Sequence, residues 1–209
     1  MKQLEPVVCV VDDDWGVRNS LRWLVESEGL AVNTFASAEA FLDACDPAQP
    51  GCLVLDVKMP GMSGLELQRE LRQRRITIPV IIISGHADVQ VAVRAFKTGA
   101  VDLLEKPFSD DDLLDRIRLA IEKDREIRAA VAERAAAAAR IALLTRREKQ
   151  VLGLVVAGSS NKEIAAKLAL SLKTVEVHRS RVMEKMQVGS LAELVRLVVH
   201  SEETLETQP

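Results

Sequence analysis

Short apolar runs rich in β-branched residues alternate with segments of helical spacing through the first half of the chain. The runs are Val7–Val11, Ala31–Phe35, Cys52–Leu55, Val80–Ile83 and Val101–Leu104. The segments with helical spacing are 15–28, 37–45, 63–74 and 89–98, and a further helix begins near Asp110. This alternation predicts an α/β fold, in which helices cover both faces of a parallel sheet and functional residues gather at the carboxyl ends of the strands.

The second half of the chain has the pattern of helices alone. From Ser109 to about Leu143 there is neither glycine nor proline, and the segment includes five consecutive alanines at 135–139. This composition predicts one long helix that acts as a semi-rigid spacer. Residues at the starts of four shorter helices follow it: Thr145, Ser160, Ser171 and Ser190. All but Ser171 have glutamate three residues later, as in a capping box, and we expect Gly158 and Gly189 to end the first and third of these helices.

These patterns divide the chain into an α/β domain over residues 1–124, a helical linker over 125–141 that continues its last helix, and an all-α domain over 142–209 with a short acidic tail. Residues 1–124 carry 14 basic and 21 acidic residues, a balance of −7, whereas 142–200 carry ten and five, a balance of +5. A basic second domain suits binding to a polyanion, although two differently solvated surfaces would explain the charges equally well.

The remaining composition excludes several classes of protein. Cys9, Cys45 and Cys52 have no metal-binding spacing and form an odd set, so we interpret them as reduced, buried residues. The apolar run at the N-terminus is too short for a signal peptide, and no segment is long enough to span a membrane. We therefore expect a cytoplasmic protein with no membrane partner.

Polar residues follow several of the predicted strands. Asp12 and Asp13 come directly after the first, Asp56 ends the third, Ser84 ends the fourth and Lys106 follows the fifth. Three carboxylates at one sheet edge repel one another unless a hard cation neutralises them, which predicts a site for Mg²⁺ or Mn²⁺. With a hydroxyl and an ammonium beside them, the carboxylate of Asp56 is placed to accept a phosphoryl group. The neighbouring Asp14 is expected to cap the first helix instead.

Four motifs at these strand ends resemble those of response-regulator receiver domains. They are Val10-Val11-Asp12-Asp13-Asp14, Asp56-x-x-Met59-Pro60-Gly61-Met62-Ser63-Gly64, Ser84-Gly85-His86 and Glu105-Lys106-Pro107-Phe108. The resemblance covers about residues 5–124 and implies a doubly wound five-stranded parallel sheet in the order 2-1-3-4-5. It also implies that Asp56 takes its phosphoryl group from a phosphohistidine on a sensor histidine kinase.

The resemblance assigns roles to the other residues of this edge. Asp13, Asp56 and the backbone carbonyl of Lys58 would hold the metal, with Asp12 helping through water. Ser84 would bond a phosphoryl oxygen, and Lys106 would pair with its charge and precede a cis proline bond. Receivers usually have Phe or Tyr three residues before this lysine, and here the position is Leu103. We therefore expect the switch to act through repacking of the fourth helix and fifth strand, without an aromatic rotor.

Residues 144–199 resemble a LuxR-type helix-turn-helix. The motifs that carry the resemblance are Leu144-Thr145-x-x-Glu148-x-x-Val151-Leu152, Gly158, Asn161-Lys162-Glu163-Ile164-Ala165 and Lys173-Thr174-Val175-x-x-His178-x-x-x-Val182-x-x-Lys185-Met186. Together with the receiver motifs, they are similar to the FixJ and NarL type of response regulator. The segment from Thr174 to Arg179 resembles the recognition helix of the FixJ branch.

A helical wheel of residues 172–186 separates a core side from a DNA side. Val175, His178, Val182 and Met186 fall on the core side, which gives His178 a structural role. The residues expected to enter the major groove are Lys173, Glu176, Val177, Ser180 and Arg181. Those expected to contact the DNA backbone are Lys162, Lys173, Thr174, Arg179 and Lys185. We expect Glu176 and Val177 to read bases, and Arg181 either to read guanine or to hold a phosphate. Part of the apolar stripe of the last helix is expected to seal the small core, and the resemblance implies that the remainder pairs two DNA-binding domains.

The sequence thus predicts a two-component response regulator. Phosphorylation of Asp56 would control dimerisation and binding to specific double-stranded DNA, and the resemblance favours activation of transcription, with RNA polymerase as a further partner. We expect no enzymatic activity beyond the receiver's own phosphorylation and dephosphorylation. A phosphatase that uses an aspartyl phosphate is disfavoured, because Lys58 replaces the second carboxylate that such enzymes carry two residues after the nucleophile.

Overall fold

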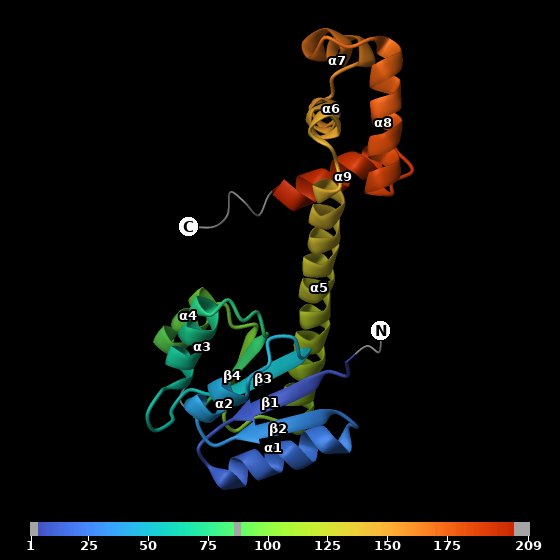
Figure 1. The fold of residues 1–209 in the computed structure, drawn as a ribbon. Helices are drawn as coiled ribbons and strands as arrows, with labels where there is room; N and C mark the ends of the chain where they lie inside the picture. Colours follow the sequence, from blue (N-terminus) through green and yellow to red (C-terminus); the bar gives the residue numbers. More distant parts are fainter. Residues whose placement is uncertain (1–3, 86–88, 203–209) are drawn as a thin grey trace. The chain divides into compact units, whose positions relative to one another are not determined.

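The computed structural model describes residues 4–85 and 89–202, and the chain divides into two compact units, Met1–Arg128 and Ala129–Pro209 (Figure 1). The long helix α5, Asp110–Ala142, runs through the boundary between them. Among the residues described, no helix is long and apolar enough to cross a membrane.

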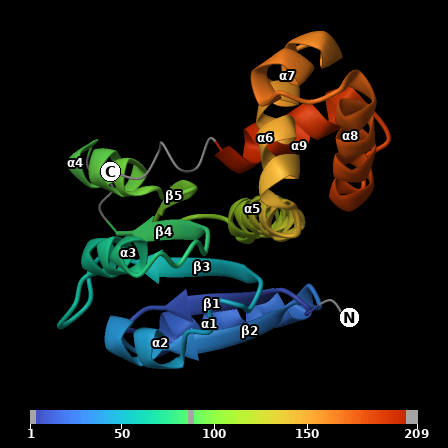
Figure 2. The same cartoon turned by 45° about the horizontal axis from the view of Figure 1, so that its top comes forward.

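The first unit is built on a parallel sheet in the order β2-β1-β3-β4-β5, which confirms the predicted fold class (Figure 2). Its strands are β1 Val7–Val11, β2 Ala31–Phe35, β3 Gly51–Asp56, β4 Val80–Ser84 and β5 Asp102–Glu105. Before α5, its helices are α1 Trp15–Ser27, α2 Ala38–Ala44, α3 Gly64–Gln73 and α4 Val89–Thr98. Strand β5 begins at Asp102, one residue later than expected. The apolar Val101 lies just before the strand and is 39% exposed.

Two hydrophobic clusters lie on opposite faces of this sheet. One packs the side chains of β3 that include Leu53 and Leu55 against α2, α3 and α4. The other packs Val54 of the same strand against α1 and α5. All six residues of β3 are buried, as in a central strand covered on both faces. The predicted site residue Asp56 therefore ends a strand that is buried along its whole length.

In the second unit, described as far as residue 202, four helices follow α5, namely α6 Arg146–Val156, α7 Asn161–Leu168, α8 Leu172–Met186 and α9 Leu191–Glu202. They enclose one small core to which all four contribute, with Ile164 and Met186 fully buried. The capping boxes at Thr145 and Ser160 are formed as expected. Gly189 does not end α8; instead Gln187 takes the left-handed conformation that closes the helix, at φ 55°.

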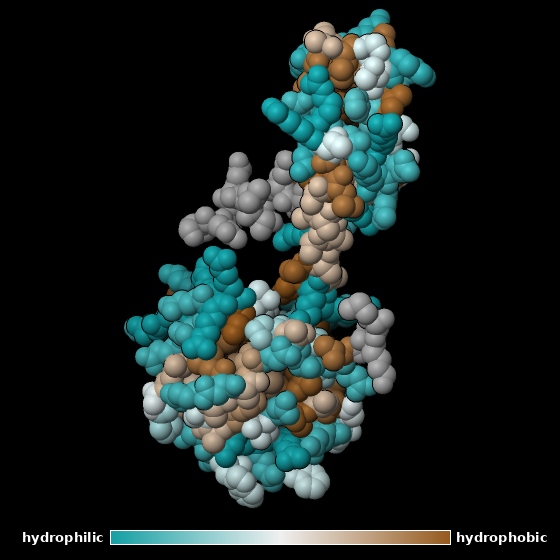
Figure 3. Space-filling view, viewed as in Figure 1, coloured by the Kyte–Doolittle hydropathy of each residue, from teal (hydrophilic) through white to brown (hydrophobic). Residues whose placement is uncertain are grey.

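The last residue of the first unit fastens α5 to the loop before β3. The guanidinium of Arg128 donates hydrogen bonds to the carbonyl oxygens of Pro47, Ala48 and Gln49, at 3.2, 3.0 and 2.6 Å. It also pairs at 2.7 Å with the buried carboxylate of Asp124. Beyond this anchor, α5 carries the alanine run, and Figure 3 shows apolar residues exposed along it; Val131 is 55% exposed.

Candidate functional site

Two buried carboxylates lie side by side at the carboxyl edge of the sheet. Asp12 follows β1 directly, and Asp56 is the last residue of β3, which pairs with β1. Their exposed fractions are 1% and 7%. Burying an unpaired carboxylate is costly, so these positions need a compensating charge or hydrogen bonds.

Lys106 supplies that charge. Its Nζ atom lies 2.9 Å from Oδ2 of Asp12 and 2.8 Å from Oδ1 of Asp56, so one ammonium bridges both carboxylates. The backbone N–H of Lys106 donates to the carbonyl of Ser84 at 2.9 Å, which aligns the residue with the end of β4. The Lys106–Pro107 peptide bond is cis, as the resemblance implies.

The pocket raises the pKa of both the Asp12 carboxyl and the Lys106 ammonium. Burial raises the pKa of the Asp12 carboxyl, and its hydrogen bonds with Lys106 and with the backbone of Asp14 offset only part of that rise. Burial alone would lower the pKa of Lys106, but its hydrogen bonds with Asp56 and Asp12 outweigh burial and raise it. The ammonium is therefore held in its charged form between the two acids.

The backbone after Asp56 is shaped around its carboxylate. Oδ2 of Asp56 accepts a hydrogen bond of 2.7 Å from the N–H of Lys58. Gly64, the first residue of α3, lies directly against the Asp56 carbonyl, and a Cβ atom there would clash with that oxygen. Glycine at position 64 thus allows α3 to begin in contact with the end of β3. This contact is a physical reason for the glycine at the end of the Asp56 motif.

Asp13 is not brought together with the two buried acids, because its side chain is exposed to solvent. Accordingly, no group of three acidic, histidine or cysteine side chains with metal-binding geometry occurs among residues 4–85 and 89–202. The donor chemistry still fits a hard divalent cation. Asp12 and Asp56 already share a cation in Lys106, and Asp13 is adjacent in sequence, so an inward turn of Asp13 would complete an oxygen-rich set.

The remaining switch residues lie where the sequence predicts. Ser84 ends β4, next to Asp56 on the neighbouring strand, and is 1% exposed. Leu103 in β5 is partly buried and packs against the hydrophobic cluster that lies between the sheet and helices α2, α3 and α4. His86, a motif residue, lies outside the described residues. Asp14 caps α1, accepting a hydrogen bond from Val17 at 3.1 Å, and is therefore separate from the site.

The cysteines lie away from this pocket and are all free thiols. Cys52 is buried, whereas Cys9 and Cys45 are partly exposed, so the interpretation as buried residues holds for Cys52 alone. Burial raises the pKa of the Cys9 thiol to about 11, which keeps it protonated.

Helix α8 presents two different sides, as the wheel predicts. Val175, Val182 and Met186 are buried in the small core. His178 lies at its border, and its Nδ1 atom is buried without a hydrogen-bond partner in the described part of the chain. The exposed residues of the opposite side are Lys173, Glu176, Val177, Ser180 and Arg181. Thr174 and Arg179 are partly exposed, and Lys162 is exposed at the start of α7.

Lys185 has a partner that the sequence did not reveal. Its Nζ atom lies 2.7 Å from Oε2 of Glu148, a residue of α6 that is 2% exposed. The same carboxylate oxygen accepts a hydrogen bond from the N–H of Thr145 at 2.8 Å. Lys185 thus ties α8 to the start of α6, and its contact with a DNA phosphate stays a prediction.

Comparison with known proteins agrees with both halves of this description. Residues 8–118 match the response regulator receiver domain, and residues 142–198 match the luxR family of bacterial regulatory proteins. The transcriptional regulatory protein FixJ of Azorhizobium caulinodans is 49% identical over 92% of this chain and 91% of its own length. The response regulator protein TodT of Pseudomonas putida is 42% identical over 99% of this chain and 91% of its own.

Solved structures give the same result. The structure of the response regulator StyR aligns with 93% of this chain and 98% of its own, at 46% identity and a TM-score of 0.82. Full-length FixJ from B. japonicum aligns with 96% of this chain and 99% of its own, at 44% identity and a TM-score of 0.59. The chain therefore belongs to the two-component response regulators that join a receiver domain to a LuxR-type DNA-binding domain.

Proposed function

We propose that a sensor histidine kinase phosphorylates Asp56, and that this modification controls dimerisation and the binding of specific double-stranded DNA. The observation that carries the proposal is the single ammonium of Lys106 shared by Asp12 and Asp56 at the carboxyl edge of the sheet. Such an arrangement places a nucleophilic carboxylate beside a fixed positive charge, which is what phosphoryl transfer requires.

In the proposed transfer, a carboxylate oxygen of Asp56 attacks phosphorus as the bond between phosphorus and the histidine nitrogen breaks. Lys106 offsets charge on the phosphoryl oxygens, and the Ser84 hydroxyl donates a hydrogen bond to one of them. Asp12, Asp13, Asp56 and the carbonyl of Lys58 would hold Mg²⁺ or Mn²⁺. Such an ion, when bound, supplies further positive charge against the phosphoryl group. Attack by water reverses the modification, and we propose no other catalytic activity.

The outward signal is proposed to pass through Leu103 and α4. Ser84 ends β4 next to β5, where Leu103 packs on the cluster below α4, so a displacement of Ser84 toward a phosphoryl group would disturb this packing. Helix α4 already exposes apolar side chains, with Val89, Val93 and Phe96 at 79, 45 and 51%. A repacked α4 would present these residues to a second receiver.

The second unit is proposed to bind DNA through α8, with Glu176, Val177 and Arg181 directed at base edges and the surrounding basic residues at phosphates. Exposure of the whole predicted face supports this proposal, and the 41% exposure of Val177 suits contact with a thymine methyl group. Pairing of two second units would involve α9, where Leu191 and Val199 are 46 and 38% exposed. By resemblance, recruitment of RNA polymerase and activation would follow.

Phosphorylation is tested with phosphoramidate as donor, in the presence and absence of Mg²⁺, on the full chain and on Asp56→Asn. The proportion of phosphorylated protein is measured by electrophoresis on a phosphate-affinity gel. We expect Mg²⁺-dependent phosphorylation of the wild type and of the control Asp43→Asn, which alters an exposed carboxylate in α2. Equal phosphorylation of Asp56→Asn would contradict the assignment.

The proposed route is tested by comparing amide chemical shifts before and after phosphorylation. We expect changes to extend from Ser84 along β5 to Leu103 and into α4. Shifts confined to residues within hydrogen-bond distance of Asp56, with Leu103 and α4 unchanged, would contradict this route while leaving the phosphorylation site intact.

A further inference from the structure

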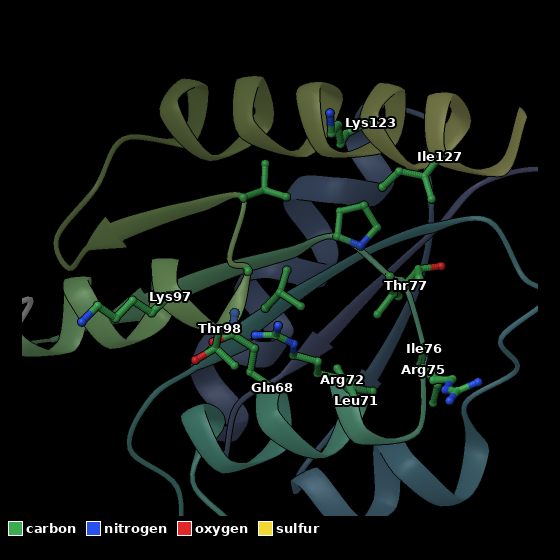
Figure 4. A pocket seen from close by; sticks show the side chains of 15 residues that line it. Gln68, Leu71, Arg72, Arg75, Ile76, Thr77, Lys97, Thr98, Lys123 and Ile127 are labelled. Atoms are coloured by element: carbon green, nitrogen blue, oxygen red, sulfur yellow. The ribbon is translucent and has the colours of Figure 1, made fainter. Parts of the chain in front are cut away.

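A second concave site lies at the end of the receiver sheet opposite Asp56. It is a groove of about 520 Å³ at the amino ends of β4 and β5 (Figure 4). Its walls are formed by α3, by the segment 76–79 that leads into β4, by the end of α4 and by α5. This volume falls within the range typical of small-molecule sites. Neither the phosphoryl switch nor the DNA-binding surface uses these residues.

The groove combines apolar walls with a concentration of positive charge. Leu71, Ile76, Val101 and Ile127 contribute to the apolar part. Of the 15 residues that line it, four are basic and none is acidic. That balance is opposite to that of the first domain as a whole, where 14 basic residues are outnumbered by 21 acidic ones over residues 1–124. The potential in the groove is therefore positive on a domain of negative charge.

Among residues 4–85 and 89–202, most of these cations have no close carboxylate partner. Arg72, Arg75 and Lys97 form no ion pair in the part of the chain that the structure describes, and Lys123 has only a long contact of 3.7 Å with Glu126. Arg74, between the two groove arginines, lies 2.7 Å from Glu70 instead. Arg74, which does not line the groove, thus has an ion pair with Glu70. Arg72 and Arg75, which do line it, have no carboxylate partner among the described residues.

Helix ends explain only part of this charge. Arg72 is in the last turn of α3 and Lys97 in the last turn of α4, where a cation is favoured by the helix dipole. Arg75 follows the end of its helix, and Lys123 lies in the interior of α5, so the dipole accounts for neither. Nor does it account for the apolar cavity between them.

We propose that this groove binds a small organic anion with an apolar body, such as a medium-chain or aromatic carboxylate. The carboxylate would lie beside Arg72, and the apolar body would cover Val101 and Ile127. Burial of the hydrocarbon favours binding, and the positively charged lining supplies selectivity for anions. A ligand in this position contacts both α3 and α5, which makes the receiver open to a chemical signal besides phosphorylation.

Binding is tested by titrating the ¹⁵N-labelled full chain with octanoate, kept below its micelle concentration. We expect saturable shifts of amides around the groove, such as those of Thr77 and Gly99. Octylammonium and octan-1-ol have the same chain without the negative charge, and acetate has the charge without the chain. Each should bind at least about tenfold more weakly than octanoate. Equal shifts with octan-1-ol or with acetate, or no saturable shift with octanoate, would overturn the proposal.

Variants test the residues directly. Arg72→Gln should raise the octanoate Kd about tenfold, and Val101→Asp should abolish binding by placing a like charge in the apolar wall. Arg94→Gln removes an exposed arginine of α4 that does not line the groove and should leave the Kd unchanged. Unchanged affinity in Arg72→Gln, with its far-UV circular dichroism intact, would contradict the site. So would an equal loss of affinity in Arg94→Gln.

Discussion

One ammonium bridges two buried carboxylates in the pocket and offsets part of their negative charge. Without it, Asp12 and Asp56 would face each other in a region from which water is largely excluded. Breaking a buried ion pair by removing one partner is strongly destabilising, because the other charge stays buried without compensation. Lys106 therefore contributes to the stability of the receiver as well as to its proposed chemistry.

Replacement of Lys106 measures its contribution to the stability of the receiver. In the absence of divalent ions, Lys106→Met should lower the free energy of unfolding of the first unit by about 1–3 kcal/mol. Adding Asp12→Asn should restore part of the loss by removing one of the two unpaired charges. Urea denaturation with hydrogen exchange resolved by unit checks this, and Arg94→Gln serves as the control. If Lys106→Met were as stable as the wild type, the stabilising role of the Lys106 ammonium would be contradicted.

The contact between Gly64 and Asp56 makes a second prediction for a single residue. A Cβ atom at position 64 would overlap the Asp56 carbonyl oxygen, so Gly64→Ala must displace either α3 or the end of β3. We expect lower stability of the first unit and slower phosphorylation by phosphoramidate. Gly153→Ala is the matched control: its Cβ meets no atom within 4 Å in the interior of α6, where alanine is favoured over glycine by about 0.5–1 kcal/mol. Normal phosphorylation of Gly64→Ala would contradict the close approach.

At the scale of elements, the start of α6 and the end of α8 form one electrostatic unit. The ion pair with Lys185 and the hydrogen bond from the Thr145 backbone lower the pKa of Glu148 to about 2. A carboxylate whose pKa is lower in the folded than in the unfolded chain stabilises the fold above its ordinary pKa of 4.5, and loses that effect as the pH falls toward 2. The second unit should therefore lose stability over this acidic range.

Glu148→Gln tests this linkage. It removes the titrating group while keeping an acceptor for the Thr145 N–H, so the second unit should be less stable at pH 7 and its stability should change less between pH 4.5 and 2. Thermal unfolding of the second unit at several pH values checks this. Glu184→Gln, an exposed glutamate of α8, should follow the wild type. An unchanged acid dependence in Glu148→Gln would exclude this pair as its source.

Helix α8 also yields a prediction about DNA. Lys173 is exposed, and its ion pair with Glu176 at 3.5 Å is too exposed to compete strongly with a phosphate. Lys173→Gln should weaken binding similarly for specific and unrelated sequences, and reduce the slope of log K against log salt concentration by about 1. Lys149→Gln, an exposed lysine of α6, should leave the slope unchanged. Fluorescence anisotropy with labelled duplexes measures both, and an unaltered slope for Lys173→Gln would remove this contact.

The elements themselves were well predicted from the sequence, because each depends on a local pattern. Apolar runs located the strands to within one residue at most ends, and capping residues located the helix starts. The features that the sequence did not reveal depend on contacts or orientations that a local pattern does not contain. Lys185 pairs with a residue 37 positions away, and Asp13 turns to solvent although its neighbour Asp12 is buried. Local pattern cannot distinguish such pairs from ordinary surface charges.

For the whole molecule, the receiver pocket and the DNA-binding face belong to different compact units joined by α5. The central claim is that phosphorylation of Asp56 is what changes dimerisation and DNA binding. The receiver pocket places Asp56 beside Asp12 and Lys106, and α8 exposes the residues predicted to contact DNA.

The most direct test is sedimentation velocity of the full chain, together with its affinity for DNA fragments selected from a random pool. Wild type and Asp56→Asn are compared with and without phosphoramidate and Mg²⁺. We predict that the donor makes the wild type dimeric and tightens its DNA binding, while Asp56→Asn stays unchanged. The same response in both proteins, or no response in a wild type shown to be phosphorylated, would contradict the account.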